Sequence, residues 1–370
     1  MKLLILSSNN GGGHNSAAEA VREVYAANGA EVMIRDCMSF LSENVSEFMS
    51  FSHVLIYRHL PWIFGNSYRK DDKNELFEDN HVAREIINLG KYTLGKLIEE
   101  EQFDSVICTH VFGGMMLTGA MDHYGLQLRT GIVETDYCNT PGSVSNCMDL
   151  HFLPHESLVQ ELVDDGLSKD KIVVSGIPVR QELLNCADHE TCRESRRRAG
   201  ECPHILMMGG SMGCGPIPEL VECLYEQFGD AVEISVVCGN NSRMEKQLKD
   251  ASTHRKNVHV LGYVPNMADL YGRADVFVTK AGGISTTEAA AIGLPLVLIN
   301  AVAGCEEYNL KFFAEHDAAL CGTTEEELAA SCRQLIEEEN LHQMVSENLK
   351  RLSHPHAAET IYEAMEGYKR

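Results

Sequence analysis

Short apolar runs alternate with longer segments of helical periodicity along the whole chain. In the first half they predict strands at 2–7, 31–36, 104–109, 130–134, 148–153 and 171–175, and in the second half at 204–208, 232–238, 258–262, 274–279 and 295–300. Helical segments such as 14–28 and 285–292 lie between them. Strands that alternate with helices form parallel sheets with crossover connections. The two series therefore predict an α/β protein of two doubly wound domains.

A polar, arginine-rich stretch at 186–203 separates the two series. It predicts a first domain over 1–186 and a second over 203–370, and its arginines suit a solvated helix face beside a linker. Three helical segments follow from about 324 to 370. The last of these helices are candidates for packing back on the first domain.

Residues 41–80 do not follow the alternation. They are rich in aromatic and apolar residues and contain the only tryptophan, Trp62, close to Phe64. One interpretation is a helix pair that fills one face of the first sheet. The other is a partly exposed patch that docks on lipid, because aromatic side chains with basic neighbours such as Arg58 and Arg69 suit a membrane interface.

Length, charge and cysteine content narrow the class of protein. The chain has 370 residues, a net charge of −23 and 13 cysteines without a C-x-x-C pair. The charge gives no basic footprint for nucleic acid, so no nucleic-acid partner is expected. Scattered free thiols indicate a cytoplasmic protein without a zinc site. No run of 18 apolar residues occurs, and the first apolar run is too short for a signal peptide, so we expect no membrane span.

The clearest candidate binding loop follows the strand predicted at 274–279. Lys280 and the small residues 281–283 come next, and Ser285 or Thr286 is expected to open a helix. A helix start offers unpaired N–H groups to an anion, and Lys280 adds a positive charge. Glu288 lies where a carboxylate reaches paired hydroxyls such as those of a ribose. The alternative is an ordinary glycine-rich turn with a serine cap.

Three further loops follow successive strands of the second half. They read "MMGGSMG" at 207–213, "VVCGNN" at 236–241 and "LGYVPNM" at 261–267. All lie at the carboxyl ends of predicted parallel strands, where α/β sheets bind ligands. The four loops together indicate one ligand site at this edge of the second sheet.

The first predicted strand leads into "SSNNGGGHNSAAEA" at 7–20. Gly12 and Gly13 let a substrate approach the backbone, and His14 has an ordinary pKa near neutrality, which suits proton transfer. The alternatives for His14 are a helix cap or a hydrogen-bond donor to phosphate. "GGGHNSA" does not match the G-x-G-x-x-G of dinucleotide-binding loops, so a dehydrogenase is the least favoured class.

The motifs of both halves resemble one family. "GGSMG", "CGNN", "GYV", "VTKAGGISTTEA" and "GCEEYN" are similar to the donor domain of the GT-B glycosyltransferases that include monogalactosyldiacylglycerol synthases and processive diacylglycerol glucosyltransferases. "SSNNGGGHNSAAEA", "THVFGG", "TDY" and "SGIPVR" fit the first domain of the same enzymes. The resemblance covers nearly the whole chain and implies a GT-B fold, with two Rossmann-like domains facing a central cleft.

The resemblance also implies a UDP-sugar on the second domain, with uracil near Gly262, the ribose on Glu288 and the sugar near Glu306. The residues implied to hold the donor are Gly210, Ser211, Met212, Gly239, Asn240, Gly262, Tyr263, Val264, Met267, Lys280, Gly282, Gly283, Ile284, Ser285, Thr286, Glu288, Cys305, Glu306 and Asn309. The family commonly has Pro-Gly-Gln-Glu where this chain has Ala303-Gly304-Cys305-Glu306. A thiol is a poor substitute for the hydrogen bonds of Gln, so the identity of the sugar stays open.

In this family the transfer inverts the sugar carbon and needs a general base. His14 is the leading candidate, with Asp136 as an alternative base or as an orienting partner. Gly12, Gly13, Trp62, Phe64 and His110 are candidates for the acceptor side. No Asp-x-Asp motif occurs in the donor region, and N–H donors can stabilise departing UDP, so we expect neither a metal nor another cofactor.

These observations predict an inverting hexosyltransferase that uses a UDP-sugar and a lipid hydroxyl, most simply that of diacylglycerol. It would work in the cytoplasm with transient contact to the membrane surface. Three alternatives stay open: a polyprenyl-linked or small-molecule acceptor, a UDP-sugar epimerase or hydrolase, and a nucleotide-sugar-binding protein without catalysis.

Overall fold

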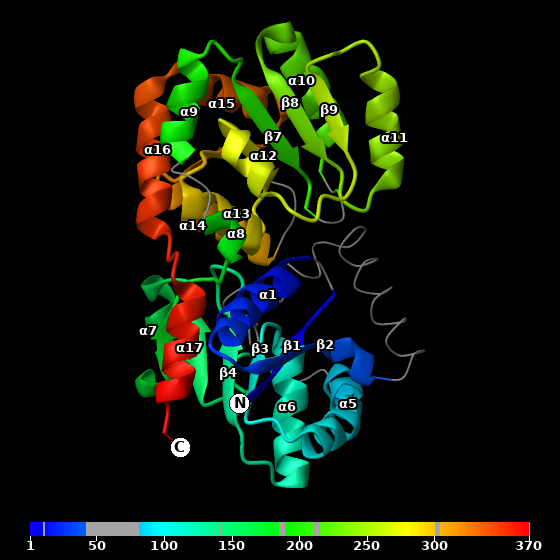
Figure 1. Cartoon of the computed structure of the whole chain (residues 1–370), viewed down its shortest axis with the longest axis vertical. Helices are drawn as coiled ribbons and strands as arrows, with labels where there is room; N and C mark the ends of the chain where they lie inside the picture. The colour runs from blue at the N-terminus through cyan, green and yellow to red at the C-terminus, as the bar shows by residue number, and fades with distance from the viewer. Residues whose placement is uncertain are drawn as a thin grey trace. The chain divides into compact units, whose positions relative to one another are not determined.

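The computed structural model describes residues 1–9, 12–41, 81–140, 142–184, 189–210, 213, 215–299 and 304–369, at 81–88 without side chains. The chain forms two compact units. Unit 1 consists mainly of residues 1–180 and 354–370, and unit 2 mainly of residues 181–302 and 306–353. Figure 1 shows a twisted sheet with helices in each unit.

Unit 1 contains a six-stranded parallel sheet in the order β2-β1-β3-β4-β5-β6. Its strands are β1 (Lys2–Ser7), β2 (Glu31–Asp36), β3 (Ser105–Cys108), β4 (Arg129–Val133), β5 (Leu150–Leu153) and β6 (Ile172–Val174). Its main helices are α1 (Gly12–Ala27), α5 (His81–Glu101), α6 (Val111–Tyr124), α7 (Val159–Asp164) and α17 (Ala357–Gly367).

The first strand is buried on both faces. Successive side chains of a strand point to opposite faces. Leu3 and Ile5 accordingly pack in one cluster with residues of α1 and α17, whereas Leu4 and Leu6 pack in another with residues of α5 and α6. A strand covered on both faces has a continuous apolar sequence, which explains the run "LLIL".

Unit 2 contains a second six-stranded parallel sheet, in the order β12-β11-β10-β7-β8-β9. Its strands are β7 (His204–Met208), β8 (Glu233–Val237), β9 (Val258–Leu261), β10 (Val276–Lys280), β11 (Leu296–Ile299) and β12 (Ala319–Gly322). Its helices include α8 (Gln181–Leu184), α9 (His189–Arg198), α10 (Ile217–Phe228), α11 (Ser242–Ala251), α12 (Ala268–Arg273), α13 (Gly283–Ile292), α14 (Cys305–Glu315), α15 (Glu325–Glu337) and α16 (Glu339–Leu352).

The α/β architecture with two doubly wound sheets is confirmed. The eleven predicted strands are present, and β12 is a strand that the sequence analysis did not predict. The prediction that Ser285 or Thr286 opens a helix was wrong, because α13 begins at Gly283 with Gly282 as its N-cap. Residues 354–370, including α17, belong to unit 1.

Each sheet has one point where the strand order reverses. In unit 1 the chain builds outward from β1 to β2 and then continues on the other side with β3. In unit 2 the reversal lies between β7 and β10. Open α/β sheets bind ligands outside the carboxyl ends of the strands at such switch points. Ligand-binding groups are therefore expected on the loops after β1 and β3 and on those after β7 and β10.

Candidate functional site

His14 lies at the switch point of unit 1, in the first turn of α1. Its Nδ1 is 2.7 Å from the carbonyl oxygen of Thr109, and the Thr109 hydroxyl donates to the carbonyl oxygen of His14 over 3.1 Å. Because a carbonyl oxygen only accepts, Nδ1 carries the proton of the neutral ring and Nε2 holds the lone pair. The ring is thus held through Nδ1 by the residue that follows β3.

Two more side chains approach this imidazole. The Thr135 hydroxyl oxygen is 3.1 Å from Nδ1, and the ring of His110 meets it edge to face with centroids 4.6 Å apart. His110 is itself the N-cap of α6, where its Nδ1 accepts from the backbone N–H of Phe112. Groups that follow β1, β3 and β4 therefore converge on His14. Thr135 was not predicted, although it precedes the half-buried candidate Asp136 in the quoted "TDY" motif.

The buried side chain of Glu134 anchors the loop after β4. This carboxyl group is 3% exposed and accepts hydrogen bonds from the hydroxyls of Thr140, at 2.7 Å, and Ser143. Burial raises the pKa of Glu134 above its usual value, and the two hydroxyl donors oppose that rise. Glu134 stabilises the loop that begins with Thr135 and Asp136.

The other acceptor-side candidates are placed as follows. Gly12 and Gly13 are the first two residues of α1, next to His14. Trp62 and Phe64 lie outside the described residues, as does the whole predicted lipid-docking patch. The structure therefore brings Gly12, Gly13 and His110 to the position of His14.

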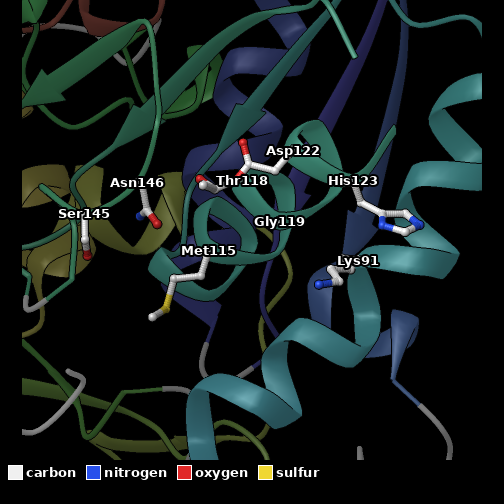
Figure 2. Close-up of a pocket in the computed structure, with 8 residues that line it drawn as sticks. All are labelled: Lys91, Met115, Thr118, Gly119, Asp122, His123, Ser145 and Asn146. Carbon is white, nitrogen blue, oxygen red and sulfur yellow. The ribbon is translucent and has the colours of Figure 1, made fainter. Parts of the chain in front are cut away.

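Unit 1 also has a polar cavity of about 390 Å³ beside α5 and α6 (Figure 2). Lys91 of α5, Thr118 and Asp122 of α6, and Asn146 of the loop before β5 are among its lining residues. None of the candidate residues of the sequence analysis lines it. This cavity is separate from the position of His14.

In unit 2 the loop after β7 needs glycine at two positions. Gly210 has a φ of +72°, and a Cβ there would lie 2.4 Å from Cε of Lys280. Gly213 has a φ of +57°, and a Cβ there would lie 2.6 Å from the carbonyl oxygen of Cys238. Both positive φ angles favour glycine. Ser211 and Met212, between them, lie outside the described residues.

Asn241 joins two of the predicted donor loops. Its side-chain nitrogen donates to the carbonyl oxygen of Gly213 over 3.0 Å, and its side-chain oxygen accepts from the backbone N–H of Met244. It is thus the N-cap of α11 and at the same time a tie to the loop after β7. Asn241 belongs to the "VVCGNN" loop but is not among the predicted donor residues. Gly239 and Asn240 form the turn just before it.

The start of α13 has the geometry of an anion site. Gly282 is its N-cap, and Gly283, Ile284 and Ser285 form the first turn, whose N–H groups have no helical partner. The Thr286 hydroxyl donates back to the carbonyl oxygens of Gly282 and Gly283, so its proton is used within the helix. The preceding turn is supported by Asn309, a fully buried residue that donates to the carbonyl oxygen of Ala281 over 2.9 Å.

Lys280, at the end of β10, forms an ion pair with Glu306 in the first turn of α14. Glu306 is 7% exposed, so the carboxylate is largely removed from water. Lys280 was predicted to add a positive charge for an anionic ligand. In the structure Glu306 compensates this charge within the protein. Cys305, the preceding residue, opens α14.

Glu288 is buried in α13, where the Tyr271 hydroxyl donates to its Oε2 over 2.9 Å. Tyr271 belongs to α12, which follows Met267. Gly262, Tyr263 and Val264 lie after β9, and the Tyr263 ring is 66% exposed. All described donor candidates on the loops after β7, β8, β9 and β10 thus follow the carboxyl ends of strands in one sheet, as predicted.

No group of three or more His, Cys, Asp or Glu side chains suited to a metal ion occurs among the described residues. Within the same part of the chain, every helix is too short or too polar to cross a bilayer.

Comparison with known proteins gives matches over both halves of the chain. Residues 14–179 match the family model of monogalactosyldiacylglycerol synthase, and residues 204–366 match that of the glycosyltransferase family 28 C-terminal domain. A processive diacylglycerol beta-glucosyltransferase of Bacillus pumilus is 27% identical over 365 residues, which cover 98% of this chain and 94% of the relative.

Solved structures share the fold. MurG of Acinetobacter baumannii superposes with a TM-score of 0.66 at 18% identity and covers 99% of both chains. A UDP-GlcNAc 2-epimerase of Neisseria meningitidis, bound to UDP-GlcNAc, has a TM-score of 0.64 at 14% identity over the full length of both. Two Rossmann-like domains of this type define the GT-B fold. With its first half of the monogalactosyldiacylglycerol synthase type and its second half of the family 28 type, the chain belongs to the GT-B glycosyltransferase family of monogalactosyldiacylglycerol synthases and processive diacylglycerol glucosyltransferases.

Proposed function

We propose that this enzyme transfers a hexose from a UDP-sugar to the hydroxyl of diacylglycerol, with inversion at the sugar carbon. The name and nearly complete coverage of the Bacillus pumilus relative support the lipid acceptor. The UDP-GlcNAc bound to the Neisseria meningitidis structure supports a UDP-linked donor. An epimerase shares the same fold, so a requirement for a lipid acceptor is what distinguishes the two functions.

The observation that carries the proposal is the orientation of His14. With the Nδ1 proton directed at the Thr109 carbonyl oxygen, Nε2 has the lone pair that a general base needs. Nε2 takes the proton of the lipid hydroxyl, and the oxygen of that hydroxyl forms a bond to the sugar C1. The bond from C1 to the phosphate oxygen breaks, and its electron pair leaves with UDP. Asp136 is the other candidate base.

The negative charge that develops on UDP would meet the N–H groups at the start of α13. Backbone donors need no reorganisation during the reaction, and we propose that the transfer uses no metal. Chelation with EDTA should then leave the rate unchanged. A rate that EDTA abolishes and Mg²⁺ or Mn²⁺ restores would contradict this part of the proposal.

The direct test is a panel of UDP-sugars crossed with lipid vesicles, with products identified by mass. We expect UDP release that depends on diacylglycerol and a glycosylated lipid as product. His14→Ala should lower kcat by about 10²- to 10⁴-fold, the usual contribution of a general base. Asp136→Asn is the matched comparison for the alternative base. UDP release without any lipid would favour a hydrolase, and binding without turnover would favour a sensor.

We further propose that the enzyme works in the cytoplasm and reaches its lipid by transient contact with a membrane surface. The free thiols of the described cysteines fit a reducing compartment. The predicted patch around Trp62 would supply the apolar contact. Replacing Trp62 and Phe64 by serine should reduce sedimentation with diacylglycerol vesicles while UDP binding is retained. Unchanged sedimentation would remove the patch from the proposal.

A further inference from the structure

Tyr271 and Glu288 form a buried pair in unit 2, in which the phenol donates to Oε2 of the carboxylate over 2.9 Å. Tyr271 is 1% exposed and Glu288 is 9% exposed. Because both side chains are almost fully buried, water has little access to compete for this hydrogen bond. The carboxylate therefore has a defined orientation before any ligand arrives.

The phenol cannot easily turn away from Glu288. Its ring meets that of Phe277 edge to face, with centroids 5.2 Å apart, and Phe277 is a fully buried residue of β10. Phe277 lies three residues before Lys280, the end of the strand that leads into α13. The pair thus links α12 to the strand and helix that form the predicted donor site.

We infer that Tyr271 is a positioning residue that sets the Glu288 carboxylate to receive the vicinal hydroxyls of a ribose, so that the pair selects ribonucleotides over 2′-deoxyribonucleotides. This inference rests on the proposed UDP-sugar donor and on the placement of its ribose at Glu288 that the family resemblance implies. A carboxylate only accepts hydrogen bonds, so it recognises a ligand with hydroxyl donors and loses a bond when one hydroxyl is absent. A carboxylate that is already oriented recognises them at a lower cost in side-chain entropy.

The experiment measures the affinity of the full chain for UDP and for 2′-deoxy-UDP by calorimetry. The variants are Tyr271→Phe, Glu288→Gln and the double variant. Phe retains the ring that packs on Phe277 and removes only the hydroxyl. The matched control is Tyr225→Phe, which removes a hydroxyl from a residue of α10 in the same unit, whose ring packs against Arg255. Thermal unfolding of each variant establishes that it is folded.

We expect the wild-type protein to prefer UDP over 2′-deoxy-UDP, and Tyr271→Phe to weaken UDP binding by about 5- to 20-fold. Binding of 2′-deoxy-UDP should change much less, so the preference shrinks. In the Glu288→Gln background the hydroxyl of Tyr271 should matter little. Tyr225→Phe should keep the wild-type preference.

The two proposals fail in different ways. If wild-type protein does not bind UDP, the proposed donor is wrong. The inference is overturned if the wild-type protein binds UDP but Tyr271→Phe keeps the wild-type preference for the ribonucleotide. It is also overturned if Tyr271→Phe weakens the binding of both nucleotides equally. In either case Tyr271 does not act through Glu288 on the ribose.

Discussion

At the scale of single residues, His14 is oriented by two groups of different kinds. The Thr109 carbonyl oxygen belongs to the backbone and cannot be removed by substitution, whereas the Thr135 hydroxyl can. Both contact Nδ1, the nitrogen that fixes the tautomer. Of the two, Thr135 therefore offers the sharper test of whether the orientation of the ring matters for the reaction.

Thr135→Val should lower kcat by about 2- to 10-fold, because one hydrogen bond to the ring contributes roughly 0.5–1.5 kcal/mol. The KM for the UDP-sugar should stay constant, since the donor is assigned to the other unit. Steady-state kinetics measures both quantities. Thr360→Val is the control, because its hydroxyl donates to the carbonyl oxygen of His356, the N-cap of its own helix α17. A raised donor KM at constant kcat would contradict the assignment.

The Lys280–Glu306 ion pair makes a second residue-scale prediction. Lys280→Met removes the positive charge opposite a carboxylate that is largely buried. Loss of one partner of a buried pair costs about 3 kcal/mol, because the remaining charge stays out of water. Urea unfolding should register this loss. The double variant K280M/E306Q should recover most of it, and a double variant as unstable as the single one would show that the pair is not the cause.

At the scale of elements, Asn241 performs two tasks in unit 2 at once. It caps α11 and holds the loop after β7 through the Gly213 carbonyl oxygen. Thr324 is a simple N-cap in the same unit, where its hydroxyl accepts from the backbone N–H of Glu327 at the start of α15. The two residues allow the loss of a cap to be separated from the loss of the tie between loops.

Asn241→Ala and Thr324→Ala should each lower the free energy of unfolding by about 1 kcal/mol for the cap. Asn241→Ala should lose a further 1 kcal/mol or so for the second hydrogen bond. Because only Asn241 holds the loop predicted to line the diphosphate, only its replacement should weaken UDP binding. Equal UDP affinity in both variants would show that the loop after β7 is not part of the donor site.

The elements of this protein differ in how far sequence alone predicts them. β1, β2 and β7 were predicted with their observed bounds. For β1 and β7 the signal is the continuous apolar sequence that strands covered on both faces need. β12, with the sequence "ALCG", is an edge strand with an exposed position and gives no such run. α13 starts earlier than predicted because Gly282 acts as an N-cap without a side-chain signal.

The candidate site likewise has parts that the sequence predicts and parts that it does not. Loops at the carboxyl ends of strands could be predicted, since strand order and handedness fix where they lie. The partners within them could not. Thr135 reaches His14 from 121 positions away, and Tyr271 reaches Glu288 from 17. No local pattern specifies such pairs, because they depend on the packing of elements that are distant in the sequence.

At the scale of the whole molecule, the two units share a sensitivity to acid. Three buried histidines have a pKa held below the ordinary 6.5 by burial: His151 in unit 1 and His204 in unit 2 at about 4, and His342 in unit 2 at about 3. Below pH 6.5 the unfolded chain binds protons that the folded chain does not. The stability that these neutral rings contribute is complete above pH 6.5 and is lost as the pH falls toward 4.

His151 tests this linkage most cleanly. It is fully buried on β5, and neither ring nitrogen has a hydrogen-bond partner in the described part of the structure. In the wild-type protein, protonation of this histidine in the unfolded chain should lower the stability of unit 1 by about 2 kcal/mol between pH 7 and pH 5. His151→Leu should remove that dependence and make the protein more stable than the wild type at pH 5, measured by urea unfolding at both pH values. The control His254→Leu replaces an exposed histidine and should leave the pH dependence of stability unchanged. If His151→Leu also leaves it unchanged, the burial of His151 is not what makes unit 1 sensitive to acid.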